Sequence, residues 1–141
     1  MEKQKIVADA SIVAKWFLEE EFSDKARQLR DSFVTGKVNI SVPSLLFYET
    51  LNALWHSRLF TEKELSLAAK ALTKYGFDAW EPQGKILEQA AAVSSEHNLS
   101  VYDASYVALA FHLKAALLTA DSELLRKFPK NTQHINTYNF Q

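Results

Sequence analysis

Two periodicities alternate along the hydrophobic and polar positions of this 141-residue chain. Short apolar runs bounded by polar or turn residues are typical of buried strands, whereas longer segments with apolar residues at helical spacing predict helices. Strands are predicted, in chain order, at residues 6–8, 38–42, 77–81, 115–120 and 134–138. Helices are predicted at residues 23–35, 43–58, 61–75, 82–97 and 102–114, with a short one directly after Asp121.

Several predicted helix ends carry recognisable signals. Ser23 is placed to be an N-cap, and Gly36 is placed to end the same helix. Pro43 stops the second strand and suits the first turn of the following helix. Thr61 and Glu64 have the spacing of a capping box. These signals predict clean boundaries between strands and helices.

The alternation of strands and helices predicts the fold class. It is typical of βαβ units, which build a mainly parallel sheet with helices on both faces, so we predict an α/β protein with a three-layer α/β/α sandwich. A length of 141 residues favours one domain, residues 1–141, with a sizeable core. In such sheets ligands bind beyond the carboxyl ends of the strands, where Asp9 and Asp121 are predicted to lie together.

Composition excludes several classes of protein. The chain is 48% hydrophobic and 23% charged, which argues against disorder. Its net charge of -1 provides no bulk attraction for nucleic acid, although a local basic rim would suffice. Without cysteine it has no disulfide and no thiolate zinc site, and its four histidines lack zinc-ligand spacing. No apolar run could cross a membrane and no signal peptide is evident, so we expect a cytoplasmic protein.

Four acids in apolar settings are the most informative feature of the sequence. They are Asp9, Glu49, Asp103 and Asp121, and each follows or interrupts a segment predicted to be core. Acids are rarely buried unless they are paired or bind a metal. Four of them at the margins of one core therefore indicate a cation site.

Each acid alone also has a simpler interpretation. Glu49 could belong to a solvated polar stripe, with Asn52, between the apolar positions of its helix. Asp103 fits a capping box with Ser100, and Asp121 could cap the turn that follows it. Asp9 has no evident capping role, and the set of four is stronger evidence than any member.

Converging carboxylates favour a hard divalent cation. They repel one another, which makes each hold its proton more tightly unless a cation offsets the charge. Mg²⁺ takes oxygen ligands, uses few carboxylates and keeps several waters. This arrangement is typical of metal-assisted phosphodiester hydrolysis, in which the metal lowers the pKa of the attacking water.

Four segments resemble the PIN domain family, and most of all the VapC-type toxins of prokaryotic toxin–antitoxin pairs. The resemblance spans nearly the whole chain in order and spacing. It is carried by residues 7–17, the helix with Pro43, Glu49 and Asn52, residues 102–110 and residues 118–121.

The resemblance implies a metal-dependent ribonuclease with an α/β/α sandwich. Asp9, Glu49, Asp103 and Asp121 would be the catalytic and metal-binding acids, around one or two Mg²⁺ or Mn²⁺ ions. Ser11 and Thr119 match hydroxyl positions that support the metal or its water. Glu123 could replace or assist Asp121, so the fourth position is the least certain of the set.

The expected function is therefore endoribonuclease activity on RNA by metal-activated water. The family implies a small cognate VapB-type antitoxin that covers the site, and frequent homodimers. The alternative is a PIN-fold RNA-binding or RNA-processing protein outside such a pair, without catalysis.

Two other enzyme and signalling classes fit less well. A haloacid-dehalogenase-like phosphatase needs a second Asp two residues after the first, where this chain has Ser11. A phospho-accepting receiver domain needs its Asp at the end of the third strand, where this chain has Trp80-Glu81-Pro82.

Overall fold

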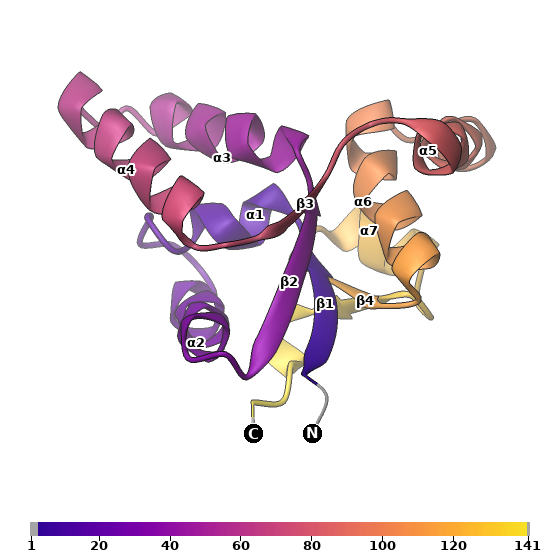
Figure 1. Ribbon diagram of the computed structural model, residues 1–141, viewed down its shortest axis with the longest axis horizontal. Coiled ribbons are helices and arrows are strands. Elements are labelled where there is room, and N and C mark those ends of the chain that lie inside the picture. Colours follow the sequence, from indigo (N-terminus) through magenta and orange to yellow (C-terminus); the bar gives the residue numbers. More distant parts are fainter. Residues whose placement is uncertain (1–2, 141) are drawn as a thin grey trace.

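A five-stranded parallel sheet forms the centre of the computed structural model, which describes residues 3–140 (Figure 1). The strand order is β3-β2-β1-β4-β5, and every neighbouring pair is parallel. The strands are β1 (Gln4–Ala8), β2 (Val38–Pro43), β3 (Asp78–Trp80), β4 (Ala116–Thr119) and β5 (Thr132–His134). The helices are α1 (Ala10–Ala14), α2 (Ser23–Val34), α3 (Leu45–His56), α4 (Glu62–Lys74), α5 (Gly84–His97), α6 (Val101–Leu113) and α7 (Ser122–Lys127).

Helices cover both faces of the sheet. Figure 1 shows α1 to α4 on one side and α5 to α7 on the other, which confirms the predicted three-layer α/β/α arrangement. The centre of the core is β1, where Ile6, Val7 and Ala8 are at most 1% exposed. Helix α6 packs on β1, β2 and β4 and has six buried residues, in line with its almost wholly apolar sequence.

The chain order sets which strand ends meet. Strand β1 lies between β2 and β4, and Ala8 pairs with Leu118. Asp9 is the residue directly after β1, and Asp121 lies two residues after the last residue of β4. The carboxyl ends of these central strands therefore place both acids at the same edge of the sheet, as predicted.

Two of the predicted helix boundaries are confirmed. Thr61 and Glu64 form both bonds of a capping box, with N···O distances of 2.9 and 3.1 Å. Gly36 has φ of +81°, a left-handed conformation that suits glycine at the end of α2.

Two other boundaries were predicted wrongly. Ser23 is the first residue of α2 rather than its N-cap, because its hydroxyl bonds back to Leu18 and Glu20 in the preceding loop. Pro43 is the last residue of β2, paired with Trp80, so the helix starts at Leu45.

The sequence pattern also missed α1 and misplaced the fifth strand. Helix α1 has only five residues, too few to show a helical period. Strand β5 ends at His134, where the prediction had it begin, and a 3₁₀-helix follows at Ile135–Thr137. Met1, Glu2 and Gln141, the ends of the predicted domain, lie outside the described residues. No helix in the described part of the chain is long and apolar enough to cross a membrane.

Candidate active site

The four predicted acids line one pocket. Asp9 comes from the end of β1, Glu49 from the middle of α3, Asp103 from the first turn of α6 and Asp121 from the end of β4. Four separate elements therefore supply one carboxylate each. The remaining lining residues are Ala10, Ser11, Ala53 and Tyr106.

Asp9 is the most buried of these acids, at 6% exposure, and both of its carboxylate oxygens accept hydrogen bonds. Oδ1 accepts from the Ser11 hydroxyl at 2.6 Å and from the Ile12 backbone N–H at 3.2 Å. Oδ2 accepts from the Thr119 hydroxyl. The bond to Ile12 makes Asp9 the N-cap of α1, so the expectation that Asp9 has no capping role was wrong, because α1 itself was not predicted.

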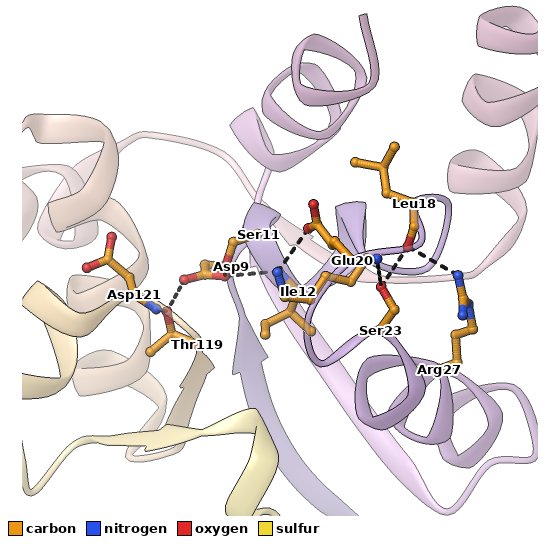
Figure 2. Close-up of polar contacts among 10 residues, drawn as sticks. Asp9, Ser11, Ile12, Leu18, Glu20, Ser23, Arg27, Thr119 and Asp121 are labelled. Carbon is orange, nitrogen blue, oxygen red and sulfur yellow. Dashed lines mark hydrogen bonds and ion pairs between the residues drawn. The ribbon is translucent and has the colours of Figure 1, made fainter. Parts of the chain in front are cut away.

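Thr119 connects two of the acids. Its side chain is fully buried at the end of β4, where its hydroxyl donates to Asp9 and accepts from the backbone N–H of Asp121 at 2.9 Å. Figure 2 shows Thr119 between these two acids, with Ser11 and Ile12 on the other side of Asp9. The hydroxyls of Ser11 and Thr119 thus fix the orientation of the Asp9 carboxylate.

Glu49 is half-buried and is held from a neighbouring helix. Its Oε1 accepts a hydrogen bond of 2.6 Å from the hydroxyl of Tyr106 on α6. Asn52, one turn further along α3, is exposed and lies in an adjoining groove rather than in the pocket. Glu49 is therefore not simply part of a solvated polar stripe.

The capping interpretations of the other two acids hold in part. The Asp103 N–H donates to the Ser100 hydroxyl at 3.1 Å, so Ser100 caps α6. Asp121 caps α7, where its Oδ1 accepts from the N–H groups of Glu123 and Leu124 at 2.8 and 3.1 Å. Neither cap turns its acid away, since both Asp103 and Asp121 line the pocket.

Glu123 lies outside the acidic pocket, although its charge is among the causes that raise the pKa of Asp103. It is exposed, it does not line the pocket, and its carboxylate pairs with Lys127 at 3.3 Å along α7. The Lys127 ammonium also donates to the carbonyl of His97 at 2.6 Å, which draws this ion pair towards the end of α5. The geometry favours Asp121 over Glu123 as the fourth acid.

The pocket raises the pKa of Asp9, Glu49 and Asp103, so these three acids are harder to ionise. Burial raises the pKa of Asp9 above its ordinary value, and the charge of Asp121 raises it further. Burial, followed by the charges of Asp103 and Asp9, likewise raises the pKa of Glu49. The pKa of Asp103 is raised by burial and then by Asp121. The pKa of each of these three acids is therefore raised in part by the charge of another acid of the set, as expected for carboxylates that lie close together.

The donor set is chemically suited to a hard divalent cation. All four groups are carboxylates, the ligands that Mg²⁺ and Mn²⁺ accept. The raised pKa values of Asp9, Glu49 and Asp103 come first from burial and then from neighbouring negative charge, which a cation would offset. Among residues 3–140, no three His, Asp or Glu side chains are already grouped closely enough to hold an ion directly. Mg²⁺ usually keeps several waters and uses one or two carboxylates, so this spacing fits ligation that is partly through water.

Sequence reasoning missed one pocket residue, Tyr106. It is 2% exposed, and it follows Asp103 by three positions, which puts both on one face of α6. The only signal in the sequence was this spacing, and an aromatic residue in an apolar helix is ordinarily read as core.

Ionisation of the buried acids should make the metal-free protein less stable. An acid whose pKa is raised by folding binds its proton more tightly in the folded state. The free energy of unfolding therefore falls as pH rises from the ordinary value of 3.8 for Asp9 through its raised folded pKa. In Asp9→Asn we expect the free energy of unfolding to fall less with rising pH than in the wild type. At pH 7 the variant should be at least as stable as the wild type, as measured by urea unfolding in EDTA.

The matched control for this measurement is Asp24→Asn, because the Asp24 side chain is 93% exposed. It should follow the wild-type profile. An Asp9→Asn protein that is less stable than wild type at pH 7 would show that the capping and hydrogen-bonding role of Asp9 outweighs its electrostatic cost.

Comparison with known proteins agrees with this geometry. A family model described as "PIN domain" matches residues 6–130. Ribonuclease VapC3 of Pyrobaculum aerophilum is 36% identical over 130 residues, which are 89% of this chain and 95% of that protein. The crystal structure of PAE2754 from the same organism has a TM-score of 0.69 at 26% identity, covering 96% of this chain and 91% of that one.

A more distant structure shares the fold alone. It is a toxin–antitoxin complex from Klebsiella pneumoniae, with a TM-score of 0.70 at 16% identity, covering 96% of this chain and 99% of that one. The family match covers most of the chain, its acidic pocket lies at the carboxyl ends of the central strands, and the chain belongs to the PIN domain family.

Proposed function

We propose that this protein is a metal-dependent endoribonuclease and the toxin of a VapBC-type toxin–antitoxin pair. The observation that carries the proposal is the convergence of four carboxylates from four separate elements in one pocket. Similarity to Ribonuclease VapC3 over 89% of the chain supports RNA as the substrate. The toxin assignment draws on the same VapC relative, and the Klebsiella pneumoniae toxin–antitoxin complex adds a shared fold.

The acids have distinct tasks in this proposal. Asp9, locked by Ser11, Thr119 and the N-terminus of α1, would be the fixed ligand for Mg²⁺ or Mn²⁺. Glu49, Asp103 and Asp121 would complete the site for one or two ions, directly or through water.

One contribution would come from the bound ion itself. Bound Mg²⁺ or Mn²⁺ supplies Lewis acidity, which lowers the pKa of water and offsets the charge of a phosphodiester. The protein contributes the fixed orientation of Asp9 and a pocket in which every charged lining group is a carboxylate. Without a cation the pocket would repel RNA, so the proposal requires the cation for binding as well as for cleavage.

A groove beside the pocket suits a segment of an antitoxin. It runs between α3 and α4, and it includes the exposed side chains of Tyr48 and Trp55. Glu49 lines both this groove and the acidic pocket. A peptide that buries its apolar side chains here would therefore cover one of the four acids.

A second apolar surface, which shares no lining residue with the acidic pocket, suits a homodimer. A pocket between the start of α3, the end of β3, and helices α5 and α6 is lined almost wholly by carbon. Large apolar side chains at its rim are exposed, with Leu87 at 43%, Val101 at 49% and Tyr102 at 65%. Exposed apolar residues gathered around a pocket are typical of a protein interface.

Cleavage of RNA should depend on a divalent cation and on the acids. Purified protein is expected to cleave RNA with Mg²⁺ or Mn²⁺ and to stop in excess EDTA. Asp9→Asn and Asp103→Asn should abolish cleavage while circular dichroism shows a retained fold. Cleavage that persists in EDTA would refute the metal mechanism, and a variant with full activity would remove its residue from the site.

Asp121 and Glu123 can be separated by matched substitutions. Asparagine caps a helix about as well as aspartate, so Asp121→Asn should leave the melting temperature almost unchanged. Loss of the charge should lower metal-dependent cleavage by more than about tenfold, a loss that even outer-shell partners of a metal can cause. Glu123→Gln, which alters an exposed ion pair, should cleave almost normally. The reverse result would assign the fourth acid to Glu123.

The dimer surface can be tested with exposed residues only. Light scattering of the isolated protein should give the mass of a dimer, and Tyr102→Lys should give a monomer with an intact fold. Leu67→Lys is the control, since Leu67 on α4 is 54% exposed and lies outside the apolar pocket. A monomeric wild type at high concentration would refute the dimer, and a dimeric Tyr102→Lys would place the interface elsewhere.

A further inference from the structure

Tyr106 is a buried polar side chain that none of the expected roles includes. Its ring is embedded in the core at 2% exposure, and its hydroxyl reaches from α6 to Glu49 on α3, at 2.6 Å from Oε1. It also lines the acidic pocket. A phenylalanine would fill the same space in the core, so packing alone gives no reason for the hydroxyl.

The direction of this hydrogen bond is fixed. A carboxylate can only accept, so the Tyr106 hydroxyl donates. Burial and the neighbouring carboxylates raise the pKa of Tyr106 far above its ordinary range, so the phenol keeps its proton. Tyr106 is therefore a permanent donor to Glu49.

The bond has a consequence for where Glu49 points. Glu49 is the only member of the acidic set that reaches the pocket from α3, and glutamate has three rotatable side-chain bonds. Burial disfavours an ionised Glu49 in the pocket, and the charges of Asp103 and Asp9 add to that cost. Without the hydrogen bond from Tyr106, the Glu49 side chain would escape both the burial and the repulsion by turning towards the open groove between α3 and α4. Glu49 also lines this groove.

We propose that Tyr106 is a positioning residue for metal binding, which holds the Glu49 carboxylate in the acidic pocket against the repulsion of Asp9 and Asp103. Helix α6 then contributes twice to the site, with Asp103 as an acid and with Tyr106, three residues later on the same face, as the donor that retains the acid of α3. This inference rests on the proposed function, because it assigns Tyr106 a task in the same cation site.

The direct test is the affinity of the protein for Mn²⁺ alone, measured by electron paramagnetic resonance of the free ion. Tyr106→Phe removes only the hydroxyl and should weaken Mn²⁺ binding by about tenfold, as loss of a partner that orients a metal ligand does. Tyr138→Phe is the matched control. Tyr138 is also buried, at 6% exposure, and its hydroxyl donates to Gln4 at 2.7 Å, at the opposite end of β1 from Asp9 and outside the acidic pocket. It should bind Mn²⁺ as wild type does.

A double-mutant cycle separates positioning from packing. If Tyr106 acts through Glu49, the loss caused by Tyr106→Phe should vanish in a Glu49→Gln background, so the two effects should not add. An equal loss in both backgrounds would overturn the inference, because Tyr106 would then act on the site by packing. Wild-type affinity in Tyr106→Phe, or loss of its fold by circular dichroism, would overturn it too.

The outcome also distinguishes this inference from the proposed function. If wild-type protein binds no Mn²⁺, the metal-dependent nuclease itself is refuted. If wild type binds Mn²⁺ and cleaves RNA while Tyr106→Phe is unchanged in both, only the role of Tyr106 is refuted.

Discussion

The buried carboxylate of Asp9 is the group through which the sheet, the first helix and the pocket are joined. Its oxygens accept from the N-terminus of α1, from Ser11, and from Thr119 on the neighbouring strand. A carboxylate with 6% exposure is costly unless such donors surround it. The same donors leave the Asp9 carboxylate little freedom of rotation. The carboxylate that needs hydrogen bonds in order to be buried is therefore also held in a well-defined position.

Three of the acids in the pocket are costly to ionise. Asp9, Glu49 and Asp103 all have raised pKa values, each through burial and then through the charge of another acid in the set. Burial of like charges lowers the free energy of unfolding, and the hydrogen bonds from Ser11, Thr119 and Tyr106 offset part of that loss. If a cation binds as proposed, it would offset more of that loss, and the stability of the protein would then depend on occupation of the site.

The sequence pattern predicts the fold and the proximity of the acids because both depend on local or topological rules. Alternating periods define a parallel sheet, and parallel strands place the residues after β1 and β4 together, so the proximity of Asp9 and Asp121 follows without coordinates. The pattern fails where an element is too short to show a period, as at α1, and the capping role of Asp9 was missed with it. Ser23 was wrongly predicted as an N-cap for another reason. Its hydroxyl forms hydrogen bonds with Leu18 and Glu20 in the preceding loop, whose structure has no periodic sequence pattern.

Tyr106 shows a different limit of sequence reasoning. Its contact with Glu49 joins residues 57 positions apart, on two helices that lie on opposite faces of the sheet and meet only where the strands end. No spacing within either helix encodes that contact, because it depends on how the sheet places α3 and α6 relative to one another. Apolar character explains why Tyr106 is buried, and only the tertiary structure explains why a hydroxyl is buried with it. Where a core aromatic carries a polar atom that reaches an acid of a pocket, the polar atom is therefore better read with the site than with the core.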